Sequence, residues 1–533
     1  MKRVYSLTTI TDENHFMRVL PMDRNKLSGH LKTNYSRMKQ KFIMLMLFSL
    51  LLFQVKAQSI ITLEQALDIA SKGSPSLQSS LFNLERTTES LNAQRAALKS
   101  QFSLNLNPVE YSNMRRFDAR ISQWYTNESF STSGIVRVDQ PILYTDGKIS
   151  LSNQFGWQSN TSDSQTGTST NKSFFNNLNL SLTQPLFTYN RTKTQIKTLE
   201  LNNENAMLSY AMQRLTLEKN VSQYFYNVYL AQMSLSIKEE ELVNTQKSHE
   251  IIKNKVDAGL AAKEELYQSE VNLATAESGV ESGHVSLENA KDLFKQYVGM
   301  DIFEEIAVMT DVAVTPIEVD GKKALEHGLA ARMELRQRQI SVETSQFDML
   351  AIKATNEFRG DMILSMGLSG DNPVLANIFD QSTKSPRVSL GFNVPVFDWG
   401  ERKARIRAQE AVINSQKLNL TNQETQIKVD IRQVIRNLSN LKNQIGIALQ
   451  NQNNSQLTYD INLERYKNGD LTSMDLNLFQ VQLSDKKMAY AQSLINYKIE
   501  LLNLKIQSLF DFTTNEAVVP EKFVKEYQAG TKK

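Results

Sequence analysis

The chain has 533 residues, of which 41% are hydrophobic, enough to build several domains or one elongated one. Its formal net charge of +3 is small, and no dense run of Lys and Arg marks a nucleic-acid-binding surface. Cysteine is absent, which excludes disulfides, thiolate metal sites and cysteine nucleophiles.

The first recognisable feature is a secretion signal. Two lysines precede an apolar run at 42–53, which has the length of a signal-peptide core and is too short to cross a bilayer as a helix. Small residues three positions and one position before Gln58 predict cleavage there. Residues 1–57 would then comprise a signal peptide and an upstream extension, with a second possible start at Met38. The alternative is a membrane anchor.

Residues 58–304 are predicted to form a first structural unit, which begins with a helical stretch at 63–99. Two later segments, at 102–106 and 178–182, alternate apolar and polar residues at every position. This period of two indicates strands. Pro185 then marks a strand-to-helix transition, since a strand end tolerates the missing backbone donor.

An insertion of about 48 residues, read from the change in repeat spacing, separates the strands of the first unit between Asn107 and Lys172. It contains a strand-like segment at 136–141 with aromatic residues on both sides. We therefore expect an additional β-hairpin at the outer or membrane-boundary end, which is not part of the helical tube and is accessory to assembly. The alternative is a disordered loop, at least over 158–173, where apolar residues are few.

Two very long helices are predicted because proline is absent from 186 to 315 and from 396 to 519. Apolar residues recur there at intervals of three and four positions, as in a coiled coil. A helix of about 65–70 residues would be roughly 100 Å long, far beyond a globular core. Each long helix is expected to end at a tip turn, at Gly259 or Gly469, because glycine permits the left-handed backbone that such a turn needs.

A linker at 305–322 is predicted to lead into a second unit at 323–511, with a C-terminal tail at 512–533. The second unit has the same plan as the first, and Pro395 again stands at a strand-to-helix transition. Its expected elements before that proline are a helical stretch at 323–356 and alternating segments at 362–368 and 388–394.

The spacing of landmarks indicates two internal repeats. Pro185 and Gly259 are separated by 74 positions, and so are Pro395 and Gly469. Each chain would then supply four strands, and even eight strands enclose little more than side chains. Several copies must therefore share one water-filled barrel, and three would give twelve strands. A soluble half-buried sheet would alternate in the same way, but the signal and the repeat favour the barrel.

The strand-ending motifs QPLF and VPVFDWG and the tip segments VDAGLAAKEELYQSEVNLA and YKNGDLTSMDLNLFQVQL resemble the TolC family of outer-membrane efflux proteins. The resemblance covers about residues 60–510. It implies a mixed α and β membrane protein, a homotrimer whose transmembrane β-barrel continues into a long periplasmic α-helical coiled-coil barrel. It also implies a place in the outer membrane, in contact with its lipid, and partnership with a periplasmic adaptor and an inner-membrane pump.

The resemblance further implies a periplasmic aperture. Asp475 matches an acidic residue that rings the closed mouth in the family, and Tyr466 matches a tyrosine that bonds to an acidic position, here Glu265. Leu471 stands where a companion arginine is expected and Leu478 where many members have a second acid, so half of the locking pattern is missing. Alternatively, Glu265 and Asp475 are solvated carboxylates at helix starts, where the helix dipole favours them.

The function expected from these observations is a passive exit duct of a tripartite efflux or type I secretion system. An enzyme is disfavoured because His249, His284 and His327 lie far apart in helical patterns, and no catalytic motif or phosphate loop is present. We expect no cofactor, no metal and no nucleic-acid partner. A periplasmic coiled-coil structural or adaptor protein without a pore is the alternative, although it leaves the strand pairs unexplained.

Overall fold

The computed structural model describes residues 59–119, 122–164, 167–309 and 314–518. The predicted signal peptide and upstream extension, 1–57, lie outside these residues. The described residues from Ile60 to Val518 form a single unit of helices and strands. None of the described helices is both long enough and apolar enough to cross a membrane.

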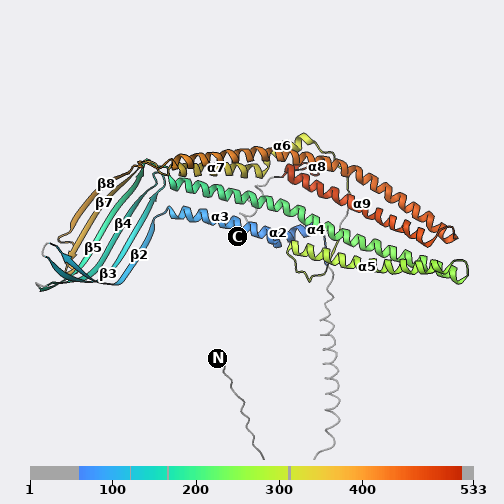
Figure 1. Ribbon diagram of the computed structural model, residues 1–533, viewed down its shortest axis with the longest axis horizontal. Helices are drawn as coiled ribbons and strands as arrows, with labels where there is room; N and C mark the ends of the chain where they lie inside the picture. Colours follow the sequence, from blue (N-terminus) through green and yellow to red (C-terminus); the bar gives the residue numbers. More distant parts are fainter. Residues whose placement is uncertain (1–58, 120–121, 165–166, 310–313, 519–533) are drawn as a thin grey trace, which may run out of the picture. The chain divides into compact units, whose positions relative to one another are not determined.

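In both halves of this unit two helices precede strands of the sheet and two helices follow them, with four such strands in the first half and two in the second (Figure 1). In the first half, α2 (Leu63–Gly73) and α3 (Pro75–Ala97) precede the strands, and α4 (Arg191–Asp257) and α5 (Lys263–Val298) follow them. In the second half, the corresponding helices are α6 (Gly321–Ala331), α7 (Met333–Lys353), α8 (Glu401–Asn468) and α9 (Ser473–Ser508). The long helices α4 and α8 have 67 and 68 residues, and α5 and α9 have 36 each.

The first helical stretch, predicted as continuous over 63–99, is interrupted. Ser74 has an extended backbone, and Pro75 begins α3, where its missing N–H costs no helical hydrogen bond. A similar interruption at Arg332 separates α6 from α7. Each short pair packs along a long helix, α2 and α3 on α4, and α6 and α7 on α8.

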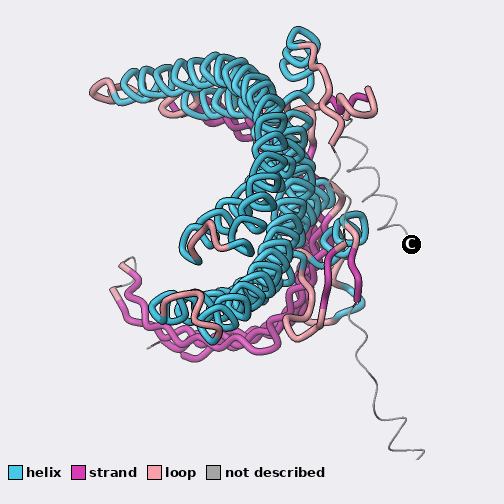
Figure 2. Tube along the Cα trace, turned by 90° about the vertical axis from the view of Figure 1, so that its right-hand side faces the viewer, coloured by secondary structure: helices cyan, strands magenta, loops and turns pink. Residues whose placement is uncertain are grey.

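Apolar seams hold the helices together. On α4, Val221 and Phe225 are fully buried, and the ring centroid of Phe225 lies 6.1 Å from that of Phe294 on α5. In the second half, Ile427 of α8 is fully buried and shares a cluster with Tyr497 of α9. Burying each such side chain contributes about 1.5–3 kcal/mol. The halves are joined because α4 also contacts α7 and α9, and Figure 2 shows the helices of this unit following a curve.

Six strands form one antiparallel sheet in the order β2-β3-β4-β5-β7-β8. The expected additional hairpin is present as β3 and β4, and it occupies the middle of the sheet. The alternative of a disordered loop is wrong for 158–164 and 167–173, which are strand. The bounds are β2 (Gln101–Asp118), β3 (Gln123–Ile142), β4 (Gly147–Ser164), β5 (Gly167–Leu186), β7 (Arg359–Asn372) and β8 (Thr383–Asn393).

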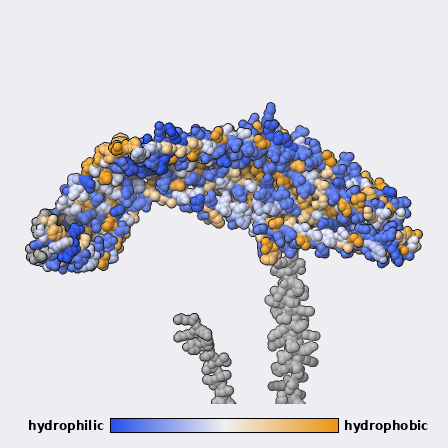
Figure 3. Space-filling view, in the orientation of Figure 1, coloured by the Kyte–Doolittle hydropathy of each residue, from blue (hydrophilic) through white to orange (hydrophobic). Residues whose placement is uncertain are grey.

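In its part nearest the helices the sheet has one apolar face and one polar face, since successive side chains of a strand point to opposite sides. One row of paired residues crosses all six strands as Phe102, Val138, Leu151, Leu180, Met366 and Pro386. The next row is polar or small throughout: Ser103, Arg137, Ser152, Asn179, Gly367 and Ser385. The apolar face is open in the single chain, where Phe102 is 77% exposed. In Figure 3, by contrast, hydrophilic residues dominate the visible surface of the helices.

Short strands close the ends of the two halves. β1 (Ser59–Ile61) pairs with β6 (Ile306–Val308), which falls in the segment predicted as a linker. After α9, β9 (Phe510–Asp511) pairs with β10 (Glu516–Ala517). The first pair of strands holds the segment before α2 against the segment after α5. The second pair folds the segment after α9 back on itself.

Candidate functional site at the tips of the helical hairpins

The chain reverses direction at two turns far from the sheet, after α4 and after α8. Gly259 and Gly469 have φ angles of +73° and +89°, the left-handed region that glycine adopts without steric cost. Gly469 ends α8, and its N–H bonds to carbonyls of the last helical turn. Thr472 then caps α9, because its hydroxyl oxygen accepts the backbone N–H of Asp475 at 3.2 Å.

The two predicted transition prolines lie at the opposite ends of the long helices. Pro185 is the penultimate residue of β5 and pairs with Asp361 of β7, while α4 begins at Arg191. Pro395 follows the end of β8, and α8 begins at Glu401. Both prolines therefore stand where the sheet gives way to a long helix.

The structure brings Glu265, Tyr466 and Asp475 to one pocket between the two tips. The pocket has a volume of about 660 Å³, and residues of both turns line it. Glu265 and Asp475 each lie in the first turn of a helix and are half-buried. Leu471 also lines the pocket, whereas Leu478 is exposed on α9.

Tyr466 does not bond to Glu265 as expected. Its side chain is buried, and its hydroxyl donates to the backbone carbonyl of Ser248 on α4 at 3.0 Å. The ring lies between the two hairpins, and in this position its hydroxyl contacts the backbone of α4 and not the start of α5, where Glu265 lies. Burial is the main cause that raises the pKa of Tyr466 to about 12, and the negative charge of Glu265 adds to it. The hydroxyl therefore stays protonated, and remains a donor, at neutral pH.

Lys255 is a second link between the hairpins, and sequence reasoning missed it. Its Nζ donates to the carbonyl oxygen of Tyr466 at 2.7 Å and lies 5.1 Å from the centroid of the same ring. Lys255 belongs to the last turn of α4, and the carbonyl belongs to the last turn of α8. A cation is favoured at both helix ends by the helix dipoles. Lys255 thus supplies a positive charge in the pocket where Leu471 replaces the expected arginine.

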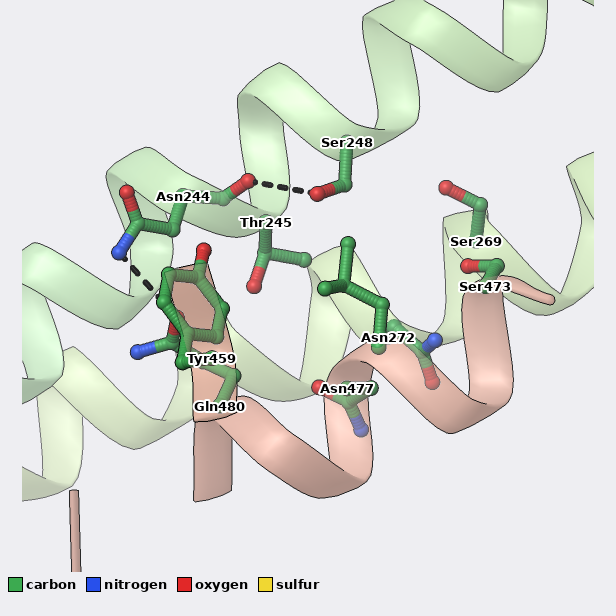
Figure 4. A pocket seen from close by; sticks show the side chains of 10 residues that line it. Asn244, Thr245, Ser248, Ser269, Asn272, Tyr459, Ser473, Asn477 and Gln480 are labelled. Atoms are coloured by element: carbon green, nitrogen blue, oxygen red, sulfur yellow. Dashed lines mark hydrogen bonds between the residues drawn. The ribbon is translucent and has the colours of Figure 1, made fainter. Parts of the chain in front are cut away.

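A small polar cavity lies beside the tips, in the seam between the hairpins (Figure 4). Its volume of about 20 Å³ is enough for about one water molecule. Asn244 of α4 donates to Gln480 of α9 at 3.2 Å across this seam, and His249 of α4 lies 3.1 Å from Ser269 of α5. Asn, Ser, Thr and Gln make up most of the lining: Asn244, Thr245, Ser248, Ser269, Asn272, Tyr459, Ser473, Leu476, Asn477 and Gln480.

Charged residues continue the seam toward the sheet. Lys487 of α9 pairs with both carboxylate oxygens of Glu240 on α4, at 2.8 and 2.9 Å. Burial raises the pKa of the neighbouring Glu241, against the opposing effect of a hydrogen bond from Ser484 at 3.3 Å. Within the described residues, no group of three or more His, Asp and Glu is placed to hold a metal ion. Beside the small apolar cluster around Tyr466 and Leu476, the tips therefore offer polar, mixed-charge contacts between two hairpins.

Comparison with known proteins assigns this architecture to a family. The family described as outer membrane efflux protein matches residues 148–282 and 361–506, which make up more than half of the chain. The chain belongs to this family. The efflux protein is thus an outer-membrane exit duct and no enzyme, and the expected resemblance to TolC-type channels is confirmed. No curated protein sequence matches the chain.

Solved structures of outer-membrane channels share the fold of the efflux protein. The CmeC channel of Campylobacter jejuni superposes with a TM-score of 0.66 at 14% identity, covering 87% of this chain and 88% of CmeC. VceC of Vibrio cholerae gives a TM-score of 0.61 at 13% identity, covering 84% of this chain and 95% of VceC. The open state of MtrE from Neisseria gonorrhoeae gives a TM-score of 0.60 at 14% identity, covering 84% of this chain and 88% of MtrE. The family places the protein in the outer membrane.

Proposed function

We propose that three copies of this chain form a continuous duct through which cargo passes passively from the periplasm to the exterior. The observation that carries the proposal is the sheet, which has an apolar face, a polar face and two edge strands. Within the described chain, β2 and β8 each pair on one side only. In lipid an open sheet edge is prohibitively costly, so the edges must meet those of further copies. Closed rotational symmetry provides complementary edges from identical chains.

Exposed aromatic residues support a membrane boundary at the end of the sheet nearest the helices. Tyr144 in the turn between β3 and β4 is 92% exposed, and Trp399 just before α8 is 90% exposed. Phe187, directly after β5, is also exposed. Outer-membrane barrels carry aromatic girdles at the lipid–water interface. We place the apolar face of the sheet against outer-membrane lipid and the polar face toward the lumen.

The tips form the periplasmic aperture in this proposal. The segments 58–304 and 323–511 act as two structural repeats, and each contributes one helical hairpin with its glycine turn, at Gly259 or Gly469. Three copies of Asp475 and Glu265 would gather negative charge near the axis, which attracts cations. A periplasmic adaptor and an inner-membrane pump, of a tripartite efflux or type I secretion system, would dock to this end and separate the tips.

The test is the mass and conductance of the detergent-solubilised particle. Corrected for bound detergent, its mass should equal three chains, and reconstitution in planar bilayers should give discrete channels. A stable monomer that conducts would refute the trimer. A trimer that never conducts, even after the tip links are removed, would favour the coiled-coil protein without a pore.

A further inference from the structure

The hairpin formed by β3 and β4 is built into the wall of the sheet. It pairs with β2 from Gln101↔Asp139 to Asp118↔Gln123, and with β5 from Lys148↔Thr183 to Ser164↔Gly167. These ladders run almost the full length of the strands. The hairpin also continues both faces, since its residues in the apolar row are Val138 and Leu151 and those in the next row are Arg137 and Ser152. A hairpin lying outside the wall would match neither face.

We propose that three copies close their sheets into a barrel of eighteen strands, in which β8 of each copy pairs with β2 of the next. The β3–β4 hairpin then forms part of the barrel wall and widens the membrane part of the duct, instead of lying outside the wall. This inference rests on the proposed homotrimer and fixes the partner of each sheet edge as the opposite edge of a second copy.

The width of the sheet supports this closure. Strands about 4.8 Å apart and tilted by about 40° each occupy about 6 Å of circumference, so six strands span about 38 Å and four would span about 25 Å. Four helices of each copy adjoin the sheet, and they contact one another in the row α3, α4, α7 and α8. At about 8–10 Å between neighbouring axes, that row is about 32–40 Å wide. Six strands therefore match the helical layer, and four would be narrower than it.

The same arithmetic applies to the closed assembly. Eighteen strands give a backbone radius of about 18 Å, whereas twelve give about 12 Å. Twelve helices in one ring have an axis radius of about 15–19 Å. Allowing about 5 Å for an inward layer of side chains, the open cross-section of the wider barrel is about three times that of the narrower one. The membrane part of the duct would then add no constriction, and selection among cargoes would fall to the tips.

Electron cryomicroscopy of the full-length particle in detergent tests the proposal, together with its mass. We expect three chains and a barrel of about 18 Å backbone radius. A trimeric particle with a barrel of about 12 Å radius and three hairpins outside it would overturn the eighteen-stranded barrel and leave the trimeric duct intact. A particle of another stoichiometry would overturn the homotrimer, and this inference with it.

Cysteine crosslinking provides an independent test, since the natural chain contains no cysteine. Leu104 of β2 pairs with Val136 of β3, so Leu104→Cys with Val136→Cys should form a disulfide in intact outer membranes. In the same cross-strand row, Leu178 lies on β5, three strands from Leu104 and about 14 Å away. The matched pair Leu104→Cys with Leu178→Cys should stay reduced. The opposite outcome, with the second pair oxidised and the first reduced, would place the hairpin outside the wall.

Discussion

Removing the charge of Lys255 should loosen the two hairpins more than any other single change at the tips. A hydrogen bond from a charged donor is worth about 1.5–3 kcal/mol, and we take the lower end because Lys255 is half-buried. The contact with the ring of Tyr466 at 5.1 Å adds about 0.5 kcal/mol. Lys255→Met therefore costs about 2 kcal/mol in each copy, which shifts the equilibrium between joined and parted tips about thirtyfold.

Single-channel recording in planar bilayers measures this effect as open probability. Lys255→Met should raise it at least tenfold, and Lys255→Arg should restore much of the closed state because a guanidinium can still donate to the carbonyl of Tyr466. Lys253→Met is the matched control, since Lys253 is exposed on the same helix two positions earlier. Equal open probabilities in Lys255→Met and the unchanged protein, both shown to be trimeric, would refute the role of Lys255 as a link between the hairpins.

Three further changes probe the same seam. Tyr466→Phe removes a hydrogen bond between uncharged groups, which is worth about 1 kcal/mol. In the same recordings this substitution should therefore raise open probability only about fivefold. An effect larger than that of Lys255→Met would contradict our ranking of the two links. Asp475→Asn should weaken block by divalent cations added on the periplasmic side, and unchanged block would place the cation site elsewhere. Circular dichroism should show unchanged helix content, because the Thr472 hydroxyl, which donates to the Asp475 carboxylate at 2.7 Å, can still donate to an asparagine oxygen. Because the pKa of Glu241 is raised above its ordinary 4.5, its protonated form favours the folded seam. Stability from this group is fully present below that ordinary value and is lost as pH rises through the raised pKa, so thermal unfolding of Glu241→Gln should depend less on pH across this window, and an identical pH profile would refute the assignment.

Patterns that repeat along the chain could be predicted, and contacts between distant segments could not. The absence of proline and the position of Gly469 sufficed to predict a long helix and its end within a few residues. Alternation found parts of β2, β5, β7 and β8. It failed for the last part of β4, because polar residues occupy both of its faces beyond Trp157 and leave no hydrophobic period there. That segment is ordered by pairing with β3 and β5, which a local pattern does not contain.

The candidate site shows the same division. Residue types at the tips indicated an acidic, hydrogen-bonded mouth, and Glu265, Tyr466 and Asp475 do meet in one pocket. Their partners could not be predicted, because both links end on backbone carbonyls. Lys255 donates to a carbonyl 211 positions away, and Tyr466 to one 218 positions away. Every residue has a carbonyl, so the sequence carries no mark of which one accepts.

The seam between the hairpins changes character along its length, and this change sets where opening can begin. At the tips a small apolar cluster, in which Ile251 of α4 packs against residues of the second hairpin, is accompanied by polar contacts. Water can replace a hydrogen bond such as that of Asn244 with Gln480 at a net cost of about 0.5–1.5 kcal/mol. Nearer the sheet, Ile495 of α9 is fully buried in the apolar cluster formed with α4 and α5. Exposing it costs about 1.5–3 kcal/mol with no compensating hydrogen bond. We infer that the two hairpins part from each other beginning at the tips, and that this separation extends as far as the pair of Lys487 with Glu240. The apolar seam between this pair and the sheet stays closed and acts as the hinge.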